Sequence, residues 1–143
     1  MKVKVKVPAT SANLGPGFDV AGLALTLYNT FTFELADQGL NITGCPEQFC
    51  NEENMTYQAF KQAAEICGLE YQGVNIECSG DVPYTRGLGS SSTCIVAGIV
   101  GAFAFKDKVE DRQEILELAT AIEGHPDNVA PAIFGGLTVS VME

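Results

Sequence analysis

The sequence predicts an α+β fold, a mixed β-sheet with helices packed on one face. Short segments in which apolar and polar residues alternate, typical of half-buried strands, open the chain and recur at residues 28–35 and 137–141. Segments with apolar residues at helical spacing lie between the later strands. The 143 residues, 46% hydrophobic and 18% charged, are enough for one domain with a buried core.

The first half of the chain predicts three strands and one helix. Residues 2–7 alternate lysine and valine, and Pro8 ends this first strand. Residues 9–17 are rich in loop-forming residues, 28–35 alternate again, and 40–53 predict a short strand followed by a polar loop. A helix is expected over 54–67, with Asn54 as its cap and Gly68 after its end. Its predicted apolar stripe is Met55, Ala59, Phe60, Ala63 and Ile66.

The second half predicts strands at 74–78 and 137–141 and two more helices. Residues 81–89 lead into a helix whose segment 94–105 is almost wholly apolar, so we expect this helix to be buried. Asp111 should cap a helix over 112–123, and Gly124 should close it. The stripe of that helix is Ile115, Leu118, Ala119 and Ile122. Residues 125–136 predict a loop with one helical stretch.

Composition limits the possible partners and cellular location. A net charge of −10 argues against nucleic acid, because phosphate backbones require clustered cations. The amino terminus lacks a signal-peptide pattern, and the run 94–105 is too short to span a bilayer. The cysteines form no C-x-x-C pair and are odd in number, which disfavours a zinc site and favours reduced thiols. They are Cys45, Cys50, Cys67, Cys78 and Cys94. We therefore expect a soluble, cytoplasmic domain with neither nucleic acid nor membrane as partner.

A glycine turn that runs into a hydroxyl-rich helix start is the strongest functional motif. It consists of Pro83, Tyr84, Thr85, Arg86, Gly87, Leu88, Gly89, Ser90, Ser91, Ser92 and Thr93. Glycines allow close backbone approach to a ligand, and the hydroxyls and N–H groups of a helix start suit phosphate. An ordinary serine cap on a core helix is the alternative. Arg86 could contact the phosphate or be a solvated loop residue.

Two further segments give this motif a context: 8–19, reading PATSANLGPGFD, and 123–128, reading EGHPDN. Together the three segments resemble the galactokinase, homoserine kinase, mevalonate kinase and phosphomevalonate kinase (GHMP) superfamily, and its homoserine kinase branch best. The resemblance implies a fold like domain 2 of ribosomal protein S5. It also implies that residues 1–143 are the N-terminal, ATP-binding domain, and that the C-terminal GHMP domain is absent from this chain.

The activity that the resemblance implies is transfer of phosphate from ATP to the hydroxyl of L-homoserine. This reaction gives O-phospho-L-homoserine in threonine biosynthesis, with ATP and Mg²⁺ as cofactors. Another GHMP small-molecule kinase, or a non-catalytic nucleotide- or RNA-binding S5-like domain, are the alternatives. We expect this half alone to be inactive and to form a homo-oligomer through apolar surface meant for the missing domain.

The resemblance also assigns site residues. By position, Glu117 and Ser91 match the glutamate and serine that bind Mg²⁺, a cation that prefers hard oxygen donors. Glu114 and Glu123 compete with Glu117, and Ser90 or Ser92 could replace Ser91. From the residues alone, Glu117 could equally be a solvated glutamate on a helix surface.

The substrate residues implied by the family are Asn13, Asp19, His125 and Asp127. The two aspartates suit the ammonium group of homoserine, while Asn13 and His125 suit its hydroxyl or carboxylate. Without the family, His125 could serve the dipole of the preceding helix. Relatives like mevalonate kinase carry an aspartate base eleven residues after the metal-binding glutamate, where this chain has Asn128. Asn128 can orient the attacking hydroxyl but cannot take its proton.

Overall fold

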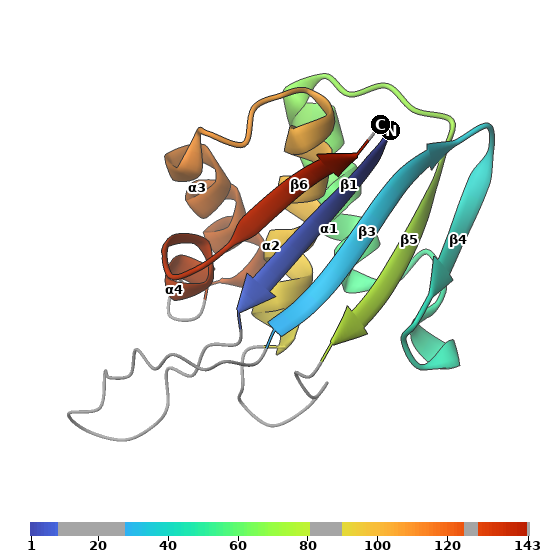
Figure 1. Cartoon of the computed structure of the whole chain (residues 1–143), viewed down its shortest axis with the longest axis horizontal. Helices are drawn as coiled ribbons and strands as arrows, with labels where there is room; N and C mark the ends of the chain where they lie inside the picture. The colour runs from blue at the N-terminus through green and yellow to red at the C-terminus, as the bar shows by residue number, and fades with distance from the viewer. Residues whose placement is uncertain (9–27, 81–89, 125–128, 143) are drawn as a thin grey trace.

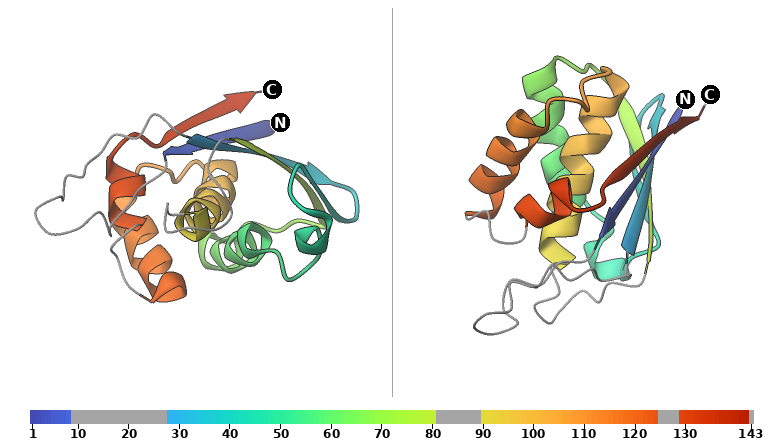
Figure 2. Two further views of the ribbon diagram at one scale, coloured as in Figure 1. Left: turned by 90° about the horizontal axis from the view of Figure 1, so that it is seen from below. Right: turned by 60° about the vertical axis from the view of Figure 1, so that its left-hand side comes forward.

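The computed structural model of the protein describes residues 1–8, 28–80, 90–124 and 129–142. Over these ranges the chain forms a five-stranded sheet with helices on one face, which confirms the predicted α+β fold (Figures 1 and 2). The strands are β1 (Lys2–Pro8), β3 (Tyr28–Ala36), β4 (Gly39–Thr43), β5 (Gly73–Gly80) and β6 (Thr138–Met142). The helices are η1 (Glu47–Phe49), α1 (Met55–Cys67), α2 (Ser90–Phe105), α3 (Arg112–Glu123) and α4 (Val129–Phe134).

The strand order is β4-β5-β3-β1-β6, and every neighbouring pair is antiparallel except β4 with β5. Pro8 pairs with Tyr28, and Asn29 pairs with Gly80. The end of β1, the start of β3 and the end of β5 therefore lie together at one edge of the sheet, at the lower edge in Figure 1.

The alternating pattern of β1 behaves as predicted. Val3, Val5 and Val7 are buried under the helices, whereas the lysines between them are exposed on the outer face. Phe33 of β3 points to the same core and stacks on Phe60 of α1, with ring centroids 5.4 Å apart. Period-two burial therefore fixes which face of the sheet the helices cover.

Helix α1 has the predicted ends, but its buried face differs in part from the predicted stripe. The Asn54 side chain accepts a hydrogen bond from the Tyr57 N–H, and Gly68 ends the helix with a φ of 79°. Met55 and Ile66, both predicted to be buried, are 45% and 53% exposed. The buried residues are Thr56, Ala59, Phe60, Ala63, Ala64 and Cys67. Packing against α2 turns the contact face toward Thr56 and Cys67, so the two apolar residues at its margins remain in solvent.

Helix α2 lies at the centre of the helical layer and is almost wholly buried from Ser92 to Ala104, as predicted. Two glycines allow its close contacts. A Cβ at Gly98 would lie 2.3 Å from the Thr56 carbonyl oxygen of α1, and a Cβ at Gly101 would lie 2.7 Å from the Phe33 ring. Residues without a side chain at these two points set the depth at which α2 sits against α1 and β3.

Helix α3 begins and ends where the sequence predicts. The Asp111 carboxylate accepts a hydrogen bond from the Glu114 N–H, and Gly124 ends the helix with a φ of 97°. Ile115 and Ala119 are buried, while Leu118 and Ile122 are half-buried. The helical stretch predicted within 125–136 is α4, whose end is held by a hydrogen bond of 3.0 Å from the Arg112 guanidinium to the Ile133 carbonyl oxygen. No helix in the described ranges is long and apolar enough to cross a membrane.

Candidate functional site

The amino end of α2 is the point at which the motif-bearing parts of the sequence converge. Residues 9–27 connect β1 to β3, 81–89 connect β5 to α2, and 125–128 connect α3 to α4. Hydrogen bonds join the first turn of α2 both to the start of β3 and to the last residue of α3. The described attachment points of all three segments are therefore neighbours at one end of the fold (Figure 1).

Two hydroxyls of α2 and one carboxylate of α3 form the polar contact at this end. The Ser91 hydroxyl donates a hydrogen bond of 3.0 Å to Glu123 Oε1, and the Ser92 hydroxyl donates one of 3.3 Å to the same oxygen. Ser91 and Glu123 are half-buried, whereas Ser92 is fully buried. Three side-chain oxygen atoms that could bind a metal ion therefore lie together beside the start of a buried helix.

Thr93 anchors this first turn to the sheet. The Asn29 side-chain amide donates a hydrogen bond of 3.0 Å to the Thr93 hydroxyl, and both side chains are buried. Because Asn29 is the second residue of β3, this bond holds the start of α2 against the sheet edge where β1 and β5 also end. The predicted hydroxyl-rich helix start therefore has distinct roles at successive positions.

The electrostatics of the contact favour an additional cation. The amino end of α2 carries partial positive charge, which suits phosphate or a carboxylate. Glu123, however, is the last residue of α3, where the helix dipole disfavours negative charge. If phosphate occupied the start of α2, the Glu123 carboxylate beside it would add like-charge repulsion. A divalent cation that contacts both anions would remove that conflict.

The structure does not bring Glu117 to this contact. Glu117 is exposed, and its Oε2 accepts a hydrogen bond of 3.3 Å from the Gln113 side chain on the surface of α3. It lies six residues before Glu123, which is about 9 Å along the helix and about 120° around its axis. Glu114 is three residues farther away, in the first turn. Among the glutamates considered from the sequence, Glu123 is the one that contacts Ser91.

Several predicted site residues lie outside the described residues. These are Asn13, Asp19, Pro83, Tyr84, Thr85, Arg86, Gly87, Leu88, Gly89, His125, Asp127 and Asn128. Their roles remain predictions, and Ser90 is described in its backbone only.

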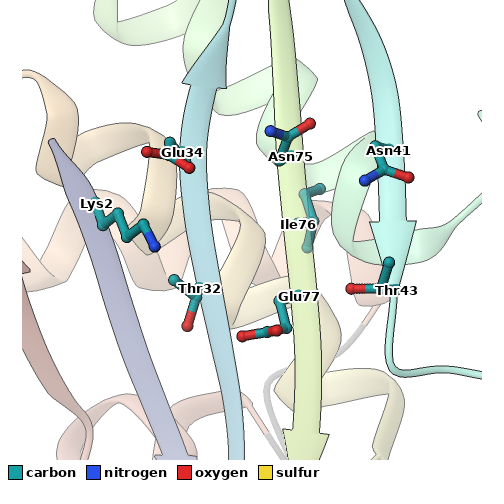
Figure 3. Close-up of a pocket in the computed structure, with 8 residues that line it drawn as sticks. All are labelled: Lys2, Thr32, Glu34, Asn41, Thr43, Asn75, Ile76 and Glu77. Atoms are coloured by element: carbon teal, nitrogen blue, oxygen red, sulfur yellow. The ribbon is translucent and has the colours of Figure 1, made fainter.

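A shallow hollow on the outer face of the sheet is separate from this contact (Figure 3). It measures about 190 Å³ and lies on strands β1, β3, β5 and β4, on the face that the helices leave uncovered. Its lining residues are Lys2, Thr32, Glu34, Asn41, Thr43, Asn75, Ile76 and Glu77. None of them is a predicted site residue, so the amino end of α2 remains the better candidate.

Comparisons with known proteins identify the family to which the chain belongs. Residues 54–136 match the family model described as the GHMP kinases N terminal domain. The chain is 53% identical over 142 residues to a homoserine kinase of Clostridium beijerinckii and 51% identical to one of Clostridium botulinum, covering 99% of this chain and 48% of each relative. It therefore spans about half the length of these relatives.

Solved structures show the same fold. A homoserine kinase structure from Listeria monocytogenes superimposes with a TM-score of 0.74 at 36% identity, covering 99% of this chain and 50% of that one. A homoserine kinase from Cytophaga hutchinsonii gives 0.70 at 28% identity, covering 96% and 48%. A mevalonate kinase shares the fold at 16% identity, with a TM-score of 0.69 and coverage of 95% and 52%. The match to the family model covers more than half of the chain, which therefore belongs to the GHMP kinase family.

Proposed function

We propose that this chain is the ATP-binding half of a homoserine kinase, with the C-terminal GHMP domain supplied by sequence beyond it. The reaction transfers the γ-phosphoryl group of ATP to the hydroxyl of L-homoserine. The observation that carries the proposal is the Ser91–Ser92–Glu123 contact at the amino end of α2. Homoserine kinases about 50% identical over nearly the whole chain support it. Because ATP is the phosphoryl donor, we place the reaction in the cytoplasm.

The start of α2 would hold the phosphates of ATP. Its first N–H groups have no partner within the helix, and its positive end favours anions. Burial of α2 against α1 and β3, together with the Asn29–Thr93 bond, fixes these donors before the nucleotide arrives. Phosphoryl transfer depends mainly on such positioning and on stabilisation of charge.

Mg²⁺ fits the donors at this end. Ser91 and Glu123 offer a hydroxyl and a carboxylate oxygen, the hard ligands that this cation prefers. We therefore assign the metal to Ser91 and Glu123 in place of the pair Ser91 and Glu117. Held by these residues, Mg²⁺ would supply positive charge that offsets the negative charge of the phosphates during transfer. The hydrogen bonds from Ser91 and Ser92 orient the carboxylate of Glu123 in this structure.

The alcohol substrate would bind beside the phosphates, next to the attachment points of residues 9–27 and 125–128. The family resemblance assigns Asn13, Asp19, His125 and Asp127 to L-homoserine, and these assignments remain proposals. Two carboxylates suit an ammonium group, which an acceptor such as mevalonate lacks. Asn128 would orient the hydroxyl without acting as a base, so the proton leaves through phosphate or solvent.

A homo-oligomer is part of the proposal. Exposed apolar side chains lie near the paired ends of β1 and β6: Met1, which precedes β1, is 47% exposed, Val141 50% and Met142 41%. Exposed apolar side chains suit contact with another protein surface. Light scattering of the full-length protein should show more than one copy per particle. A monomer across the micromolar range would overturn this part of the proposal.

ADP release by the full-length protein tests the proposed reaction. We expect release to require both Mg²⁺ and L-homoserine and to remain at background with mevalonate. ³¹P spectra should show the phosphate on the homoserine hydroxyl. Turnover with mevalonate in place of homoserine would assign a different GHMP kinase. ATP binding without turnover on any alcohol would point to a non-catalytic nucleotide-binding domain.

A further inference from the structure

A cluster of thiols lies in the connection between β4 and α1, outside the proposed nucleotide site. Cys45 and Cys50 flank the one-turn helix η1, and their sulfur atoms are 3.1 Å apart. Both side chains are half-buried. The Cys50 thiol also lies 3.6 Å from the carbonyl oxygens of Cys45 and Pro46, which holds it over the turn. A disulfide of about 2.05 Å therefore requires the two sulfurs to approach by only about 1 Å.

The connection is fixed at both ends, so this proximity is part of the fold. Gly44, with a φ of 87°, packs so closely on β5 that a Cβ would lie 1.8 Å from the Cys78 carbonyl oxygen. At the other end the Asn54 amide donates a hydrogen bond of 2.9 Å to the Phe49 carbonyl oxygen. Asn54 also caps α1 through the Tyr57 N–H, so η1 is tied to the start of that helix.

A third thiol lies nearby but is less suited to oxidation. Cys78 of β5 is only 6% exposed, so its sulfur is poorly accessible to an oxidant in solvent, whereas Cys45 and Cys50 are half-buried. Burial, together with the neighbouring Cys50, raises the pKa of Cys45 to about 11. Within the described residues, no three or more cysteine, histidine or acidic side chains are arranged to hold a metal. The geometry therefore favours a thiol pair over a metal site.

We propose that Cys45 and Cys50 are a redox-modification site, which a low-molecular-weight disulfide such as oxidised glutathione converts to an intramolecular disulfide. One protein thiolate attacks the glutathione disulfide, forming a mixed disulfide and releasing one glutathione thiol. The second protein thiolate then displaces the other glutathione thiol. Two protein thiols are oxidised and one glutathione disulfide is reduced to two thiols. The two protons that leave the protein thiols end on the two glutathione thiols. The new disulfide would cross-link the two ends of η1 within the connection between β4 and α1.

Peptide mapping can locate the bond, because trypsin places Cys45 and Cys50 in one peptide and the other three cysteines in two different peptides. Cleavage after Lys6, Lys61, Arg86 and Lys106 puts Cys45 and Cys50 in residues 7–61, Cys67 and Cys78 in 62–86, and Cys94 in 87–106. The full-length protein is equilibrated in glutathione buffer, quenched with acid, alkylated and digested. We expect peptide 7–61 to lose the mass of two hydrogens and to resist alkylation, while the other two peptides are fully alkylated.

The same equilibrium, measured in urea, shows whether the folded structure brings the two sulfur atoms together. The constant for disulfide formation should be at least about tenfold larger in the native protein than in the unfolded chain. Cys50→Ser should abolish the bond, and Cys67→Ser, which changes a buried thiol elsewhere, should keep it. A link between peptides 7–61 and 62–86, a stable glutathione adduct, full alkylation, or equal constants in both states would each overturn the proposal. The wild-type map decides the matter even if Cys50→Ser does not fold.

Discussion

At the scale of single residues, Glu123 is the side chain whose position is hardest to explain by stability alone. A carboxylate in the last turn of a helix opposes the helix dipole by about 0.3–1 kcal/mol. Here the cost is offset by two hydroxyl donors and by the positive end of α2. The same arrangement that stabilises Glu123 also presents its carboxylate where phosphate and metal would meet.

Thr93 provides the first prediction at this scale. Thr93→Val keeps the side-chain shape but removes the hydroxyl that accepts a hydrogen bond from the buried Asn29 amide. We expect the free energy of unfolding to fall by about 1–3 kcal/mol, measured by urea denaturation. Thr138→Val, at an exposed position of β6, is the control and should change it by less than about 0.5 kcal/mol. Equal effects of the two substitutions would mean that the Asn29–Thr93 bond does not hold α2 in place.

The buried thiols give a prediction about alkaline pH. The pKa of Cys78 is raised by burial from 9.0 to about 12, so above pH 9 the unfolded chain loses a proton that the folded chain retains. The unfolded state then binds fewer protons, and stability falls as the pH rises from about 9 toward 12. Cys78→Val, which cannot ionise, should reduce this slope in urea denaturation with a reductant present. An unchanged slope would contradict the assigned burial effect.

At the scale of elements, the packing of α2 determines where the site lies. Gly98→Ala should push α2 away from α1, because the added Cβ would lie 2.3 Å from the Thr56 carbonyl oxygen and 2.8 Å from the Ala59 Cβ. Alanine favours helices, so any loss must come from overpacking, which typically costs about 1–3 kcal/mol. Gln62→Ala, at an exposed position of α1, is the matched control. If both variants melted at the wild-type temperature, the close contact between α1 and α2 would be contradicted.

Element boundaries were largely predictable because caps are local. Asp111 and Gly124 mark the ends of α3 through contacts within a few residues, and Asn54 and Gly68 do the same for α1. The buried face of α1 was less predictable. Met55 and Ile66 fit a helical period, but packing against α2 selects a slightly rotated face. Periodicity in a sequence predicts the width of the apolar face of a helix better than it predicts which residues at the margins of that face are buried.

At the scale of the whole molecule, the fold gathers the attachment points of three distant segments at one end. The glycine turn, the opening loop and the EGHPDN segment were recognisable as motifs, because their residue types are tied to backbone and ligand chemistry. Which glutamate faces Ser91 was not predictable from sequence. Glu117 and Glu123 lie on one helix, and only the packing of α3 against α2 separates them. The parallel β4–β5 pair also depends on tertiary contacts that no local pattern shows.

The Mg²⁺ dependence of ATP binding tests the assigned site most directly. Calorimetry on the full-length protein would compare ATP affinity with and without Mg²⁺ for the wild type, Glu123→Gln and Glu117→Gln. Loss of a charged partner costs about 1.5–3 kcal/mol, so Glu123→Gln should reduce the gain from Mg²⁺ by roughly 10- to 150-fold. Glu117→Gln, a change on the exposed surface of α3, should leave the gain intact. Loss of the gain in Glu117→Gln and its retention in Glu123→Gln would contradict the site described at the amino end of α2.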